Sequence, residues 1–238
     1  MTDLRKEEAI GEPVMALQSF ILMILAIVMG SMIAAVLLPN WIPGLSSSLL
    51  GPEPKFYWYL SRGTAFASFG LLWLSMALGL MISNKMARMW PGGPIAFDLH
   101  QYTSILGLGI AIFHAFILLG DSYINYSVAQ VLTPFASNYE SYWVGLGQVG
   151  IYLWLLLVLS FYVRKTIGTK SWRVLHFISF LSFALVMIHG IASGSDSGEI
   201  WAMRMYWFAG GSLLFLTLYR VFANPKLFAK APRAIKQN

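Results

Sequence analysis

Residues 98–119 form an apolar segment long enough to cross a lipid bilayer, and this segment carries two histidines, His100 and His114, fourteen positions apart. Because a helix rises about 1.5 Å per residue, the two imidazoles are expected roughly 21 Å apart along its axis, within a hydrocarbon core of about 30 Å. They project only about 40° apart around the axis. Gly107 lies midway between them on nearly the same face, which leaves room on that face for something flat.

A second apolar segment, residues 172–192, repeats the pattern with His176 and His189, thirteen positions apart. The chain has four histidines, so these two segments contain all of them. A single histidine in a membrane helix is usually a hydrogen-bonded core residue, but that interpretation does not explain two helices with two histidines each. An ionisable side chain inside a membrane segment is a functional candidate, and paired imidazoles on two helices are the ligands that two stacked haems need.

The composition indicates an integral membrane protein. Of the 238 residues, 58% are hydrophobic and 11% are charged, whereas a soluble domain has about 25% charged residues. The absence of cysteine excludes disulfides, thiolate-bound iron–sulfur clusters and thioether-attached haem, so any haem is held non-covalently. The basic residues behind the net charge of +6 concentrate in loops on one side, which indicates membrane orientation and not nucleic-acid binding.

With about 20 residues per span, the chain is predicted to be an all-α, polytopic bundle of six transmembrane helices. The predicted spans are residues 14–38, 58–82, 98–119, 143–163, 172–192 and 200–222. Together they make one transmembrane domain for two haems, residues 14–222. A polar N-terminal cap, residues 1–13, precedes this domain, and a basic tail, residues 223–238, follows it.

The connections between the spans set the orientation. The proline-rich residues 39–56 predict a loop, residues 164–173 a short basic turn, and residues 127–135 a short helix in the membrane interface. Thirteen of the sixteen Lys and Arg residues fall on the side of the two termini and three on the other. Since positive charge accumulates on the cytoplasmic side, both termini are predicted to be cytoplasmic in a multi-pass protein of the cell (inner) membrane.

This orientation pairs the histidines. The two histidine helices run in the same direction, so His100 and His176 are expected at the inner level and His114 and His189 at the outer level. The spacing of thirteen places the side chains of His176 and His189 roughly 140° apart around an ideal helix. The helix formed by residues 172–192 must therefore be locally distorted or reach the two levels from different flanks.

Neutral imidazole is a suitable ligand for haem iron, and histidine on both faces gives a six-coordinate centre that passes electrons and leaves no open position for substrate. Each ligating histidine is expected to donate its second N–H to an acceptor. Ser104, Ser179 and Ser182 are nearby candidates, and backbone carbonyls would serve as well.

Haem propionates are anionic and favour basic partners. Arg173, close before His176, is a candidate for the inner haem, and Arg62 and Arg204, at the outer ends of their helices, are candidates for the outer one. Arg173 is equally well explained as orientation charge. Arg62 lies on the outer side against the charge rule, which favours a functional role.

Three motifs give the chain its resemblance to a known family: YLSRGTAFASFGLLWLSMALGL, FDLHQYTSILGLGIAIFHAF and SWRVLHFISFLSFALVMIHG. They are similar to the ferric reductase-like transmembrane domain of ferric reductases, NADPH oxidases and the haem-binding subunit of the bacterial methionine sulfoxide reductase system. The resemblance covers roughly residues 59–222. It implies two b-type haems, held by His100 with His176 and by His114 with His189, that carry electrons from the cytoplasmic to the outer face.

The chain departs from the oxidases of this family in one respect. Those proteins continue into a flavin- and nicotinamide-binding domain, whereas this sequence has no glycine-rich nucleotide loop. We therefore expect no flavin or nicotinamide site in this chain, and an electron supply from another protein or from quinol.

These expectations favour a transmembrane electron-transfer protein, a membrane subunit of a reductase or of a larger electron-transport complex. Its partners would be membrane lipid, an electron donor and other subunits. One alternative is a structural or assembly subunit of a membrane complex. Another is a transporter that uses intramembrane histidines to move protons or metal ions.

Overall fold

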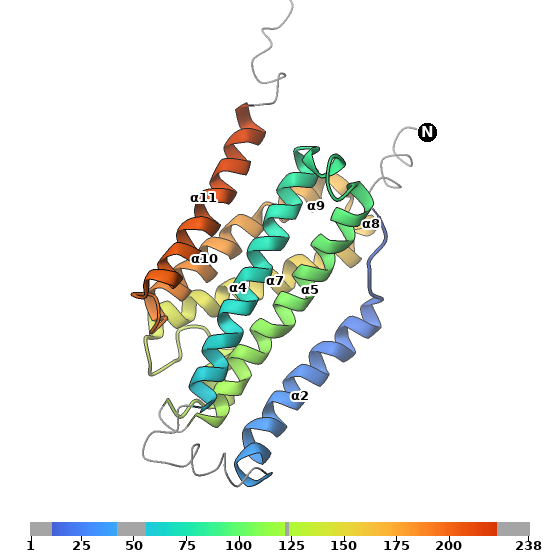
Figure 1. Ribbon diagram of the computed structural model, residues 1–238. Coiled ribbons are helices and arrows are strands. Elements are labelled where there is room, and N and C mark those ends of the chain that lie inside the picture. Colours follow the sequence, from blue (N-terminus) through green and yellow to red (C-terminus); the bar gives the residue numbers. More distant parts are fainter. Residues whose placement is uncertain (1–10, 42–55, 122–123, 223–238) are drawn as a thin grey trace, which may run out of the picture.

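The structure, a computed structural model, describes residues 11–41, 56–121 and 124–222 (Figure 1). Within these ranges the chain forms helices, turns and loops and no strand, which confirms the all-α prediction. The predicted basic tail, most of the predicted cap and most of the predicted proline-rich loop lie outside the described residues.

Each predicted span corresponds to a helix or a helix pair. The elements are α2 (Leu17–Trp41), α4 (Phe56–Ser83), η1 (Met86–Arg88), α5 (Gly93–Ile117), η2 (Leu118–Gly120), α6 (Val128–Leu132), α7 (Ser141–Tyr162), α8 (Arg164–Ile167), α9 (Thr169–His176), α10 (Ile178–Ser193) and α11 (Ile200–Phe222). The short helix predicted within residues 127–135 is present as α6, where Ser127 and Gln130 form a capping box. The predicted basic turn is instead largely helical. It contains α8 and the first part of α9, and only Gly168 separates these two helices.

Five segments in the described part of the chain are long and apolar enough to cross a membrane. They are Leu17–Leu38, Phe56–Ser83, Gly93–Gly120, Ser141–Tyr162 and Thr169–Ser193. The segment predicted as the sixth span is helical throughout as α11, but it is not among these five. Arg204 and Arg220 lie within this helix and lower its mean hydropathy.

The centre of the bundle is the antiparallel pair of α4 and α5 (Figure 1). α2 packs along α5 on one side, and α11 packs against α4 on the other. α7 and α10 form a second closely packed pair. Side chains from both pairs meet in one core, where the rings of Phe69 on α4 and Phe183 on α10 stack with their centres 5.7 Å apart. The two pairs thus face each other across the middle of the protein.

The two histidine helices are built differently. α5 is continuous through His100 and His114, whereas its counterpart is interrupted at Phe177, between α9 and α10. The N–H of Phe177 bonds to the carbonyl of Val174 at 3.1 Å, and the N–H of Phe180 to the carbonyl of Phe177 at 3.2 Å. These three-residue spacings are tighter than those of an α-helix. Of the two predicted ways to accommodate the thirteen-residue spacing, a local distortion is present, directly after His176.

Candidate functional site

The four histidines come together in two pairs, one on each half of the bundle. The ring centres of His100 and His176 are 6.1 Å apart, with their planes at 71°. Those of His114 and His189 are 6.4 Å apart, with their planes at 66°. In each pair one imidazole comes from α5 and the other from the broken helix of α9 and α10.

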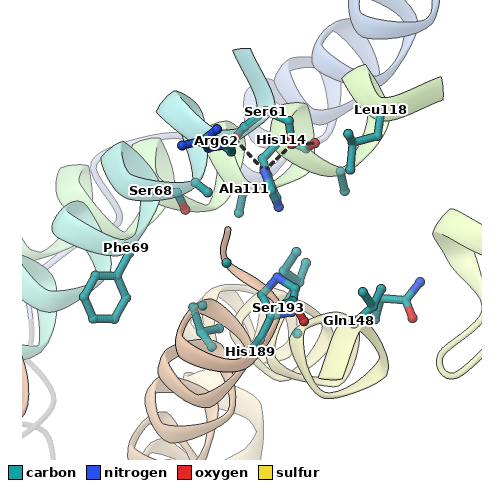
Figure 2. A pocket seen from close by; sticks show the side chains of 18 of the residues that line it. Ser61, Arg62, Ser68, Phe69, Ala111, His114, Leu118, Gln148, His189 and Ser193 are labelled. Atoms are coloured by element: carbon teal, nitrogen blue, oxygen red, sulfur yellow. Dashed lines mark hydrogen bonds between the residues drawn. The ribbon is translucent and has the colours of Figure 1, made fainter. Parts of the chain in front are cut away.

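Each pair lines a cavity. His114 and His189 lie on opposite sides of the larger one, which we call the outer cavity after its predicted membrane side (Figure 2). Its empty volume is about 1290 Å³, including space open to the outside. His100 and His176 line the inner cavity, whose empty volume, measured in the same way, is about 780 Å³.

The separation of the rings suits a metal ion between them. Metal–imidazole bonds are roughly 2.0–2.1 Å long, so two nitrogens on opposite sides of a metal ion lie roughly 4 Å apart. Each nitrogen lies about 1.1 Å from the centre of its ring, so the two ring centres are expected about 6.3 Å apart. The two observed separations, 6.1 and 6.4 Å, bracket this value. The ring-centre distance in each pair is therefore compatible with two imidazoles on one metal ion.

Hydrogen bonds from Nδ1 orient three of the four rings. Nδ1 of His100 donates to the carbonyl oxygen of Ser75 at 2.8 Å, and Nδ1 of His114 donates to that of Ser61 at 2.8 Å. Each serine hydroxyl in turn donates to the backbone carbonyl of the same histidine at 3.2 Å. Because Nδ1 is engaged, Nε2 is the nitrogen left for a metal.

The role of Ser61 and Ser75 was missed in the sequence, although a signal was present. They are fourteen positions apart on α4, the same spacing as His100 and His114 on α5. Two antiparallel helices with equal spacings bring both serine–histidine contacts into register. Matching spacings on neighbouring helices would have identified them.

The second imidazole of each pair has a different environment. Nδ1 of His189 donates to the carbonyl oxygen of Trp143 on α7 at 3.0 Å. Gly147 allows this approach, because a Cβ there would lie 2.6 Å from Cγ of His189. Nδ1 of His176 is buried and has no hydrogen-bond partner among the described residues. His176 is thus the one histidine of the four whose Nδ1 makes no bond in the described part of the chain.

The three serines predicted as acceptors do not bond to the histidines. The hydroxyl of Ser104 accepts a bond from Nε1 of Trp154 at 3.0 Å, and that of Ser182 donates to the carbonyl of Gly150 at 2.9 Å. Ser179 lines the inner cavity. Backbone carbonyls, the other predicted kind of acceptor, take the three Nδ1 bonds instead.

The flat group beside Gly107 is an indole of the same chain. A Cβ at Gly107 would lie 2.8 Å from Cη2 of Trp154. Trp154 is 2% exposed and lines both cavities. The absence of a side chain at Gly107 therefore admits the aromatic ring that separates the two cavities.

The three predicted arginines lie in unequal positions. Arg62 lines the outer cavity, but its guanidinium forms an ion pair with Asp196 from the loop between α10 and α11, with Nε donating to Oδ2 at 2.6 Å. Arg173 and Arg204 are exposed and line neither cavity. The structure brings only Arg62, of the three, to a histidine pair.

In the described residues, no group of three or more His, Cys, Asp or Glu side chains is arranged to hold a metal ion. Comparison with known proteins gave no match with a protein-family model, a curated protein or a solved structure.

Proposed function

We propose that this protein transfers electrons across a membrane through two b-type haems, ligated by His100 with His176 and by His114 with His189. The observation that carries the proposal is the spacing of the two pairs, whose ring centres lie 6.1 and 6.4 Å apart. Imidazole is a common axial ligand of haem iron, and two of them complete its coordination. When bound, each haem supplies a centre that accepts and releases one electron.

The donor set of each cavity fits this group. Each pair provides two imidazoles, and no group of three or more His, Cys, Asp or Glu side chains is arranged to hold a metal in the described residues, so the two imidazoles of each pair would hold the iron of a bound haem. The bonds from Nδ1 of His100, His114 and His189 to carbonyl oxygens fix the rings and increase the basicity of Nε2. Both cavities are lined mainly by apolar and aromatic side chains, which exclude water from a bound haem.

We further propose six spans with both termini in the cytoplasm of the cell. α11 supports a sixth span, because it is 23 residues long, packs against α4 and runs alongside the bundle (Figure 1). The thirteen-to-three distribution of Lys and Arg supports the orientation. Because the chain has no cysteine, single cysteines test it directly. A membrane-impermeant thiol reagent applied to intact cells is expected to label Ser127→Cys and not Thr169→Cys, and the reverse would overturn the orientation.

In this arrangement the protein is a membrane subunit that receives electrons at the inner pair from a separate donor protein or from quinol, and delivers them at the outer pair. The chain's own residues hold the two centres at fixed positions: α5 supplies one ligand of each pair from a single rigid helix. That common helix fixes the separation of the two centres, on which the rate of electron transfer between them depends.

The decisive measurement is the haem content of the purified protein. A dithionite-reduced spectrum is expected to show b-type absorption with two haems per chain, and a colourless protein without iron would refute the proposal. A two-haem spectrum would also argue against a histidine-dependent transporter. Stopped-flow reduction with candidate donors then separates an electron carrier, whose haems are reduced rapidly, from an assembly subunit whose haems only stabilise it.

A further inference from the structure

The inner cavity contains three buried polar atoms that make no hydrogen bond with any described residue. They are Oη of Tyr162, Nε1 of Trp172 and Nδ1 of His176, and all three residues line the cavity. Most buried polar side-chain atoms in native proteins have a partner, and an unpaired donor is costly. Three in one cavity indicate that a polar part of a ligand belongs there.

Two of these three residues, Tyr162 and Trp172, can donate a hydrogen bond to a polar group of the ligand. Trp172 lies one turn before His176 on α9, with the two ring centres 5.0 Å apart, and Tyr162 is the last residue of α7. The indole N–H can only donate, and the tyrosine hydroxyl is free to donate. With His176 assigned to the iron through Nε2, its Nδ1 stays unpaired among the described residues as well, and Tyr162 and Trp172 are the two donors outside the iron ligands that call for an acceptor oxygen.

The lining of the inner cavity includes no Lys or Arg among the described residues. Arg173, the predicted partner of the inner propionates, is exposed and outside this lining. The amide of Gln101, another lining residue, bonds to the segment before α2: its Nε2 donates to the carbonyl of Glu12 at 3.2 Å, and its Oε1 accepts from the N–H of Val14 at 3.2 Å. An anionic group in this cavity would meet neutral donors.

We propose that the hydroxyl of Tyr162 and the indole N–H of Trp172 bind a carboxylate of the ligand in the inner cavity. The inference rests on the proposed function, in which that carboxylate is a propionate of the inner haem. It assigns the propionate to two neutral side chains, one at the end of α7 and one in the middle of α9, and leaves Arg173 as orientation charge.

The test removes each donor and keeps its ring. Tyr162→Phe, Trp172→Phe and the double variant are made in the full chain, with Tyr102→Phe and Trp207→Phe as controls, since both control side chains are more than half exposed. Haem transfer to apomyoglobin and the midpoint potential of each haem are measured. The same measurements in a His189→Ala background, where only the inner haem is expected, assign the signals.

Each single substitution is expected to accelerate loss of the inner haem by about tenfold, because hydrogen bonds to charged groups are the strong ones. The double variant should lose it faster still, with the outer haem and the controls unchanged. The midpoint potential of the inner haem should fall, since a less compensated carboxylate favours the oxidised, more positive centre. Unchanged transfer rates and potentials in a protein that holds two haems would overturn this inference and leave the proposed function intact.

A further variant separates hydrogen bonding from packing. Trp172→Gln keeps an N–H donor and loses the ring, so it is expected to retain the inner haem better than Trp172→Phe. The opposite order would assign Trp172 to packing and overturn its role as a donor. A wild-type protein without haem would instead refute both this inference and the proposed function on which it rests.

Discussion

The inner and outer cavities share one half of their construction and differ in the other. On the shared side, α4 and α5 repeat the same contact, with Ser75 and His100 at one level and Ser61 and His114 at the other. On the opposite side, His189 is tied to α7, whereas Nδ1 of His176 makes no bond within the described residues. The histidine spacing is consistent with the difference: fourteen positions suit a continuous helix, and the helix with thirteen is broken at Phe177.

The polar groups of the two cavities differ as well. The outer cavity has a charged pair at its edge, Arg62 with Asp196. It also has two buried neutral atoms without a hydrogen bond to any described residue, Oε1 of Gln148 and Oγ of Ser193. The inner cavity has the neutral donors of Tyr162 and Trp172. A ligand of the same kind would thus meet a fixed, charged setting in one cavity and a neutral, less constrained one in the other. We expect the outer haem to be the more firmly held of the two.

The largest expected effect separates the two pairs completely. His189→Ala should remove the outer haem and leave the inner one, so the haem content measured by the pyridine haemochrome method should fall from two per chain to one. His176→Ala should do the reverse. Loss of both haems, or of neither, in a protein that still folds would contradict the pairing.

A smaller effect is expected where a glycine makes room for a histidine. In Gly147→Ala the added Cβ would lie 2.6 Å from Cγ of His189, whereas in Gly79→Ala it would lie 3.2 Å from Cε1 of His100. Overpacking costs about 1–3 kcal/mol, so Gly147→Ala should weaken outer haem binding by roughly tenfold or more, measured by haem transfer. Gly79→Ala should change inner haem binding less.

Gly63→Ala is the matched control for this pair, because a Cβ at Gly63 would meet nothing within 4 Å. It should leave both haems unchanged. If Gly63→Ala weakened outer haem binding as much as Gly147→Ala, the effect would come from helix stability and not from contact with His189.

The repeat on α4 and α5 predicts equal and modest effects at its two levels. Ser61→Ala and Ser75→Ala each remove a hydroxyl that donates to the histidine backbone carbonyl at 3.2 Å and lies 2.8 or 3.1 Å from Nδ1, and leave the serine carbonyl to accept from Nδ1. Each should lower the free energy of unfolding by about 0.5–1.5 kcal/mol, measured by thermal denaturation. Ser83→Ala, at an exposed hydroxyl bonded within its own helix, should have little effect. Clearly unequal losses of unfolding free energy in Ser61→Ala and Ser75→Ala would show that the two serine–histidine contacts are not equivalent.

Much of the fold follows from the apolar pattern of the sequence. Long apolar segments separated by polar connections predicted the helices, and the two histidine spacings predicted that one histidine helix is regular and that the other is either distorted or reaches the two levels from different flanks. The span count depends on α11, where Arg204 and Arg220 reduce the apolar signal. A mean hydropathy over about 20 residues is lowered by the two arginines and takes no account of the packing of α11 against α4.

The finer contacts of the site depend on helix packing, which the sequence does not encode locally. Backbone carbonyls are present at every residue, so nothing singled out Trp143 as an acceptor, and the matched spacing of Ser61 and Ser75 has meaning only once α4 and α5 are known to be neighbours. In the same way, the room at Gly107 was apparent, but its occupant, Trp154, lies 47 positions away on α7. The predicted arginines were assigned by membrane level and, for Arg173, by closeness to His176 in the sequence, and neither determines which side chains face a cavity.

The charged pair at the outer cavity should give the smallest effect. The side chains of Arg62 and Asp196 are 28% and 17% exposed, and ion pairs near the surface contribute up to about 1 kcal/mol. Arg62→Gln should therefore lower the free energy of unfolding by less than about 1 kcal/mol, and less at high salt because screening already weakens the pair. Arg173→Gln, at an exposed side chain away from both cavities, serves as the control and should leave both haem potentials unchanged. If Arg62→Gln shifted the midpoint potential of the outer haem strongly while Asp196→Asn did not, Arg62 would act on the haem directly. Arg62 would then be part of the haem-binding site and not only the partner of Asp196.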